Sequence, residues 1–326
     1  MAKSKNESEG PKPLAIHTCA LTLAQAKKLR GILSGQGWDF AERPYTLFYA
    51  QKDRLTVAVY EKGPKVVVQG RGTEEFVRFT LEPEVLGEAR LGYEELNNPE
   101  MFEPHFGVDE SGKGDFFGPL VIAGAYTDAE TTRALMDAGI QDSKRIGSDA
   151  RIRELAHIIR RTRGVVASVV LIGPAKYNAL YGKFRNLNRL LAWGHAQVIE
   201  NLVKQRPDCP RALSDQFANP ALIKRALAEK NCTIQLDART KAESDVAVAA
   251  ASILAREGFI NWLHEASGKY GTEIGKGVSN VVKDQARKLV AEHGPEFLQQ
   301  VAKVHFKTAG EIAPSFYTSN AAPIPE

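Results

Sequence analysis

One run of small apolar residues, 246–255 (VAVAAASILA), limits most strongly what this chain can fold into. A helix that lacks bulky side chains lets another backbone approach closely, so the helix that we expect over residues 246–267 should pack directly on a sheet. The run itself is far too short to span a bilayer. An acidic segment, residues 241–245 (KAESD), comes just before it. The packing would carry these acids toward the sheet.

The second half of the chain alternates between short apolar runs and helical stretches. The apolar runs are 106–108, 120–125, 165–172, 212–213 and 233–236, and the helical stretches are 148–161, 186–204, 220–230 and 246–267. This alternation predicts an α/β layered domain, which we place at residues 105–312.

The first hundred residues follow a different pattern. Thr22 and Gln25 have capping-box spacing before a helix, three strand-like runs follow at 45–51, 55–61 and 65–69, and a short helix is expected over 73–79. We therefore predict a small α-βββ-α unit at residues 14–82. Residues 1–13 are expected to be a disordered leader, 83–104 an acidic linker and 313–326 a loose tail.

Composition excludes several classes of protein. The chain has 326 residues, of which 43% are hydrophobic and 25% charged, as in an ordinary globular protein. Its three cysteines are widely spaced and form no CxxC motif, which argues against a zinc site or a disulfide scaffold. The polar N-terminus lacks a signal-peptide pattern. We expect a cytoplasmic monomer without a membrane partner. The net charge of +4 permits a polyanionic partner.

The densest motif is the segment 107–119 (GVDESGKGDFFGP), in which an apolar strand runs into two carboxylates and a glycine-rich turn. Asp109 and Glu110 would face opposite ways in a strand, so they can act together only if the strand ends or bulges there. The plain interpretation is a surface turn after a core strand. The turn is not a phosphate-binding Walker loop, because GxxxxGK[ST] is absent.

Further acids stand at comparable places. Asp215 follows another short apolar run, while Glu243 and Asp245 precede the small-residue helix, where Asp245 can also be read simply as its N-cap. Clustered carboxylates repel one another unless cations lie among them, and ligand sets made only of oxygen favour Mg²⁺ or Mn²⁺ over zinc. Two such ions about 4 Å apart can stabilise the attacking and leaving oxygens of an in-line phosphoryl displacement.

These residues resemble the type 2 ribonuclease H family, and in particular its ribonuclease HIII branch. The matching segments, over roughly residues 105–310, are DESGKGDFFGPLV, QDSK at 141–144, PAKYNALYGKFRNLNRLLAWGHA at 174–196, SDQF at 214–217 and TKAESDVAVAAASILAR at 240–256. The N-terminal unit is similar to the TATA-binding-protein-like domain that marks this branch. The resemblance implies an α/β, ribonuclease-H-like catalytic domain preceded by a small α+β substrate-binding domain.

The resemblance also implies an activity, which is hydrolysis of the RNA strand of an RNA/DNA hybrid to leave 3′-OH and 5′-phosphate ends. Asp109, Glu110 and Asp215 would be ligands of two Mg²⁺ or Mn²⁺ ions. The fourth acid stays open, because Glu243 stands nearer the position of the acid in the family's KAD sequence, whereas Asp245 lies nearer the helix.

Substrate contacts follow from the same motifs. Ser111, Gly112, Lys113 and Gly114 match the glycine–basic–glycine loop that the family uses on the RNA backbone, where a bare backbone can approach a ribose 2′-OH. Ser143 or Lys144 is expected to touch a phosphate. Over residues 14–80, ten Lys and Arg stand against six Asp and Glu, which suits a nucleic-acid partner.

Three alternatives remain at this point. The first is ribonuclease HII-like cleavage at single embedded ribonucleotides. The second is a metal-dependent nuclease or phosphatase of unrelated fold that uses the same acids. The third is a nucleic-acid-binding module with a degenerate catalytic half, although all the expected acids are present.

Overall fold

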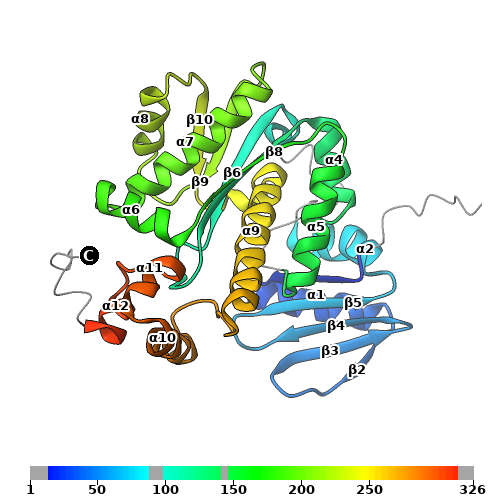
Figure 1. Ribbon diagram of the computed structural model, residues 1–326. Helices are drawn as coiled ribbons and strands as arrows, with labels where there is room; N and C mark the ends of the chain where they lie inside the picture. Colours follow the sequence, from blue (N-terminus) through cyan, green and yellow to red (C-terminus); the bar gives the residue numbers. More distant parts are fainter. Residues whose placement is uncertain (1–13, 88–97, 141–145, 315–326) are drawn as a thin grey trace, which may run out of the picture. The chain divides into compact units, whose positions relative to one another are not determined.

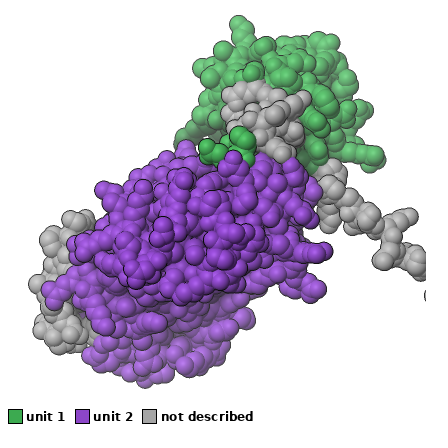
Figure 2. Space-filling model, turned by 90° about the horizontal axis from the view of Figure 1, so that it is seen from above, with its two compact units in different colours: residues 1–100 green, residues 101–326 purple. Residues whose placement is uncertain are grey.

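The computed structural model describes residues 14–87, 98–140 and 146–314. The chain divides into two compact units, residues 1–100 and 101–326 (Figure 2). The boundary falls inside the segment that we expected to be a linker, 83–104. The predicted leader 1–13 lies outside the described residues, and so does nearly all of the predicted tail.

Unit 1 contains a five-stranded antiparallel sheet in the order β1-β5-β4-β3-β2. Its strands are β1 (Ile16–Ala20), β2 (Asp39–Ala41), β3 (Thr46–Lys52), β4 (Leu55–Tyr60) and β5 (Lys65–Gly70). The three central strands were predicted, whereas the two edge strands were missed. Both edge strands are short, and β2 is exposed throughout, so neither carries a clear alternation of buried and exposed residues.

Helices cover one face of this sheet. Helix α1 (Leu23–Gly35) begins at the predicted capping box of Thr22 and Gln25. Helix α2 (Thr73–Phe76) continues as a wider π-helix, η1 (Val77–Leu86), through Pro83. The helical segment therefore extends four residues beyond the predicted boundary at residue 82. Apolar residues of α1 and η1 form one core with strand residues that include Val57, Val59, Val66 and Val68.

Unit 2 is built on a five-stranded mixed sheet in the order β10-β9-β6-β7-β8. Its strands are β6 (His105–Ser111), β7 (Leu120–Thr127), β8 (Val166–Ile172), β9 (Arg211–Asp215) and β10 (Gln235–Arg239). Strand β6 pairs parallel with β9 and antiparallel with β7. All five strands correspond to the apolar runs of the sequence, because each run is buried on at least one face of the sheet.

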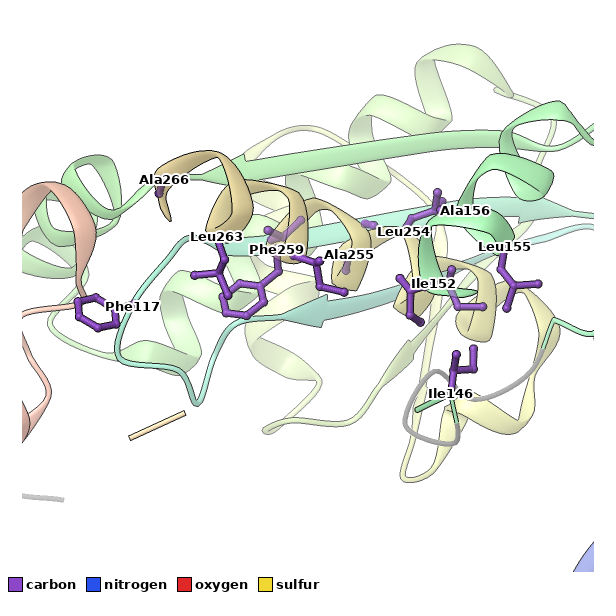
Figure 3. Packing of buried hydrophobic residues seen from close by; sticks show 14 of the residues in the cluster. Phe117, Ile146, Ile152, Leu155, Ala156, Leu254, Ala255, Phe259, Leu263 and Ala266 are labelled. Carbon is purple, nitrogen blue, oxygen red and sulfur yellow. The ribbon is translucent and has the colours of Figure 1, made fainter. Parts of the chain in front are cut away.

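Two helical layers enclose this sheet (Figure 1). Helices α5 (Asp149–Arg161) and α9 (Val246–Tyr270) pack on one face in one hydrophobic cluster, part of which is shown in Figure 3. Helices α7 (Leu187–Gln205) and α8 (Ala221–Glu229) contribute to the cluster on the other face. Helix α9 is apolar and long enough to cross a membrane, but 72% of its apolar window is buried inside the protein, as expected of a core helix.

Several helices and short turns from residue 99 onward were not predicted from the sequence. They are α4 (Ala129–Asp137), α6 (Pro174–Phe184), α10 (Asn280–His293), α11 (Leu298–Val301) and α12 (Lys307–Ile312), with the short turns η2 (Pro99–Phe102), η4 (Ala242–Ser244) and η5 (Pro295–Phe297). Most of them are short, which leaves too few residues to show a helical period.

The small-residue helix packs on the sheet as the sequence predicts. Residues 246–255 are all buried. At the crossing with β6, a Cβ on Gly107 would lie only 2.2 Å from the backbone carbon of Ala247 and the backbone nitrogen of Val248. The contact is therefore backbone against backbone, and it sets the depth at which α9 lies beside the acids of β6.

Candidate active site

The site forms where two parallel strands separate. Strand β6 pairs with β9 only over Phe106–Val108, which lie opposite Ala212–Ser214. The next residue on each strand is an aspartate, Asp109 on β6 and Asp215 on β9. A cavity of about 360 Å³ opens there. Its lining residues are Asp109, Glu110, Ser111, Gly112, Lys113, Gly114, Asp115, Asp215, Ser252 and Arg256. Seven of these were predicted as site residues.

Strand β6 does not end at the Asp109–Glu110 pair, contrary to the condition that we set for the two acids to act together. Pairing with β7 continues through Asp109 opposite Ala123, Glu110 opposite Ile122 and Ser111 opposite Val121. The two side chains therefore lie on opposite faces of the sheet. Both still line the cavity, because β9 no longer covers that edge of β6.

Asp109 lies in a desolvated position under α9. Its Oδ1 accepts a hydrogen bond of 2.8 Å from the Glu110 amide, and the Ser252 hydroxyl of α9 also hydrogen-bonds to this carboxylate. Burial, followed by the negative charge of Glu110, raises the pKa of Asp109 to about 7. A cation bound in the cavity would stabilise the charged form of this carboxylate and lower its pKa.

Glu110 is held from the opposite face. His195 Nε2 of α7 lies 3.0 Å from Glu110 Oε2. On the solvent side, the Lys113 ammonium lies 3.8 Å from Glu110 Oε1 and 5.5 Å from the centre of the Phe217 ring. Lys113 is half-exposed, so it can move toward an anionic ligand without leaving a buried group unpaired.

Asp215 connects β9 to the segment before α9. Its Oδ1 accepts a hydrogen bond of 3.0 Å from the Ala242 amide at the start of η4. The next residue, Glu243, is half-buried and does not line the cavity. Glu243 is therefore the neighbour of Ala242, the residue whose amide hydrogen-bonds to Asp215.

Asp245 has a different role from the other acids. It is buried, and its side chain caps α9 by accepting from the amides of Ala247 at 2.9 Å and Val248 at 3.3 Å. The buried His105 Nε2 lies 3.0 Å from Asp245 Oδ1. Asp245 does not line the cavity. The alternative that it is simply the N-cap therefore agrees with the structure, because its oxygens are already engaged.

Three lining residues were not named as site residues: Asp115, Ser252 and Arg256. Ser252 is the one polar residue in the small-residue run, a signal that could have identified it. Ser143 and Lys144 lie outside the described residues.

The wall of the cavity beyond Gly114 is held by a buried lysine, Lys303. Its ammonium donates to the carbonyls of Asp115 at 2.9 Å, Phe117 at 3.2 Å and Gly118 at 2.8 Å. The Asp115 carboxylate in turn accepts from the Gly277 amide at 2.6 Å. The loop after the glycine motif is therefore fixed to the C-terminal part of unit 2.

The carboxylate set fits a hard divalent cation. It offers oxygen donors only, and Asp109 is desolvated beside two other acids. Within the described ranges, no three His, Cys, Asp or Glu side chains are already gathered as a metal cluster. Mg²⁺ is usually bound in proteins by one or two carboxylates together with several waters.

Comparison with known proteins identifies the family. The Ribonuclease HII family model matches residues 106–309, which include every acid of the cavity. The chain is 41% identical over 304 residues to a ribonuclease HIII of Chlamydia pneumoniae, covering 93% of this chain and 98% of that protein. It is 42% identical over 292 residues to the ribonuclease HIII of Protochlamydia amoebophila, covering 90% and 95%. The chain belongs to the ribonuclease HII family and, within it, to the ribonucleases HIII.

Solved structures agree on the fold. Bst-RNase HIII in complex with Mn²⁺ matches with a TM-score of 0.64 at 24% identity, covering 94% of this chain and all of that one. Aquifex aeolicus RNase H3 matches with a TM-score of 0.51 at 28% identity, covering 88% and 99%. The predicted fold class, an α/β catalytic domain of ribonuclease H type after a smaller α+β unit, is confirmed.

Proposed function

We propose that this chain is an endonuclease that hydrolyses the RNA strand of RNA/DNA hybrids. The observation that carries the proposal is the cavity at the β6–β9 separation, where Asp109, Glu110 and Asp215 line the same space as Ser111–Gly112–Lys113–Gly114. Acids suited to divalent ions thus stand beside a glycine loop suited to a ribose. Family membership supports the same substrate.

Each group has a definite task in this proposal. Asp109, Glu110 and Asp215 would hold two Mg²⁺ or Mn²⁺ ions, which when bound supply the stabilisation of the attacking and leaving oxygens. The Ser111–Gly114 backbone would contact the ribose 2′-OH, which distinguishes RNA from DNA. Lys113 would bind a phosphate, and Lys303 would keep the loop wall in place. We assign the fourth acid to Glu243.

The test is cleavage of four labelled substrates in Mg²⁺ and in Mn²⁺. They are an RNA/DNA hybrid, a DNA duplex with one embedded ribonucleotide, single-stranded RNA and double-stranded DNA. We expect the hybrid to be cut with 3′-OH and 5′-phosphate products and the last two to stay intact. Cleavage of the single-ribonucleotide duplex alone would favour the ribonuclease HII-like alternative, and cutting of DNA would contradict the proposal.

We further propose that unit 1 helps to bind the hybrid. A cavity of about 600 Å³ at the β2–β3 hairpin is lined by Arg30, Phe40 and Arg43, among others. The Arg43 guanidinium lies 3.9 Å from the centre of the Tyr49 ring, and Arg30 lies 5.7 Å from that of Phe40. Cationic groups presented over aromatic rings suit the phosphates and bases of nucleic acid.

We also propose that the protein is a monomer located in the cytoplasm. In support, Cys19, Cys209 and Cys232 are widely spaced in the sequence and form no CxxC motif, which suits a reducing compartment. Light scattering at two protein concentrations would test the monomer.

A further inference from the structure

The two carboxylates of β6 are each met by a polar side chain from the helix on their own side of the sheet. Ser252 of α9 hydrogen-bonds to Asp109. His195 of α7 reaches Glu110. His195 is fully buried, with its ring 4.8 Å from that of Phe217. A buried imidazole is costly unless both its nitrogens have partners, so its placement here calls for a reason.

Both ring nitrogens of His195 are engaged. Nε2 lies 3.0 Å from Glu110 Oε2, and Nδ1 lies 3.1 Å from Ser214 Oγ. The Ser214 hydroxyl also lies 3.0 Å from the backbone carbonyl oxygen of Asp215. The imidazole therefore links β6 to β9 at the point where the direct pairing of these strands stops.

The residue before His195 makes this reach possible. A Cβ on Gly194 would lie 2.7 Å from Cδ1 of Ile122, a residue of β7 that pairs with Glu110. A larger residue at this position would press on the Ile122 side chain, which would have to move or let α7 shift. Gly194 thus lets α7 lie close to β7, and at this distance the His195 side chain can reach Glu110.

We propose that His195 is a positioning residue, which fixes the Glu110 carboxylate and sets its place relative to Asp215. The inference rests on the proposed function. Without the imidazole, Glu110 would turn about its side-chain bonds at the one edge of β6 where no strand supports it. Partners that orient metal-binding side chains in this way are typically worth about 10- to 100-fold in metal affinity or activity.

Two amide substitutions in the full-length chain separate the two contacts. In His195→Gln the amide nitrogen falls near the place of Nε2 and can still donate to Glu110, whereas in the shorter His195→Asn it falls near Nδ1 and reaches only Ser214. His157→Gln, at an exposed position on α5, is the matched control. For each variant we would measure kcat and KM on the hybrid, Mn²⁺ affinity by calorimetry without substrate, and thermal unfolding.

We expect His195→Asn to lower kcat and Mn²⁺ affinity by about 10-fold or more, with KM for the hybrid nearly unchanged. His195→Gln should restore both to within about threefold of the parent, and His157→Gln should not differ from it. In a Glu110→Gln background, His195→Asn should cause no further loss, because the group that it positions has already changed.

Two results would overturn the inference. One is that folded His195→Asn and His195→Gln match in kcat and in Mn²⁺ affinity. The other is that the losses of His195→Asn and Glu110→Gln simply add. If His195→Asn does not fold, Ser214→Ala removes the partner of Nδ1 without changing a residue of α7, and unchanged Mn²⁺ affinity there would count against the role. Failure of the parent protein to cut the hybrid would refute the proposed function, while the Mn²⁺ titrations would still decide the role of His195.

Discussion

Two acids only two residues apart, Glu243 and Asp245, have different surroundings. Asp245 is a buried N-cap of α9 that also faces His105, whereas Glu243 lies half-buried on η4 next to the Asp215 contact. Sequence spacing alone could not separate them, because both precede the same helix. The hydrogen bonds of the folded state show that Asp245 already has partners for its oxygens.

Single amide substitutions distinguish these two acids. We expect Glu243→Gln to lose most of its activity at nearly normal stability, because the change removes a charge beside the site. Asp245→Asn should instead lose about 1–2 kcal/mol of unfolding free energy, because it removes a negative charge from the N-terminus of α9 and leaves His105 with a poorer partner. Activity assays and urea unfolding would check both. Full activity of Glu243→Gln together with an inactive but stable Asp245→Asn would reverse the assignment.

The acids of the site could be identified from the sequence, whereas His195 could not. Asp109, Glu110 and Asp215 could be identified because each stands at or just after an apolar run, where strands present side chains to an edge. His195 could not, because its importance depends on α7 lying close to β7, a tertiary contact that a helical pattern does not specify.

At the scale of elements, the crossing of α9 over β6 fixes the geometry of the site. Small residues made this crossing predictable, since they leave the helix no bulky surface. The edge strand β1 was not predictable because its partner β5 lies about 50 residues further along the chain. Strand β2 was missed because its three residues are all exposed and show no alternation.

Gly107→Ala should be strongly destabilising, by about 3 kcal/mol or more, because the added methyl group would meet the backbone of α9 at Ala247. Gly182→Ala is the control, since this helical glycine of α6 has no atom within 4 Å of an added Cβ and should gain about 0.5–1 kcal/mol. Urea unfolding of both variants would check this. Similar stability of the two would mean that α9 does not lie against β6 as described.

His305, two residues after Lys303, should make the unfolding free energy depend on pH. His305 stacks on Tyr181 with ring centres 4.1 Å apart. Burial, with a smaller contribution from the charge of Lys303, lowers the pKa of His305 to about 4. The folded protein therefore keeps this imidazole neutral at pH values where the unfolded chain, with a pKa of about 6.5, already binds a proton.

Acidification between pH 6.5 and 4 should consequently favour unfolding. From pH 7 to pH 5, we expect the unfolding free energy of the parent to fall by about 1–2 kcal/mol more than that of His305→Phe, which cannot bind the proton. Urea unfolding at both pH values measures the difference. Equal losses in the two proteins would show that His305 is not kept neutral by the fold.

At the scale of the whole molecule, two units with separate cores share one chain. If unit 1 contributes phosphate contacts, removal of residues 1–100 should raise KM for the hybrid far more than it lowers kcat at saturating substrate. The affinity of the full chain should also fall more steeply with salt, by about one log–log unit per lost phosphate contact. Binding measured against salt for both proteins decides this, and equal affinities with equal slopes would leave unit 1 without a substrate role.

We propose that the carboxylates at the β6–β9 separation perform the hydrolysis. The most direct test is the cleavage rate of an RNA/DNA hybrid by Asp109→Asn, measured in Mn²⁺ beside the parent protein, with folding checked by thermal unfolding and hybrid affinity measured separately. We predict that cleavage is abolished while the fold and most of the hybrid binding remain. A folded Asp109→Asn variant that cuts the hybrid at close to the parent rate would show that these carboxylates do not perform the hydrolysis.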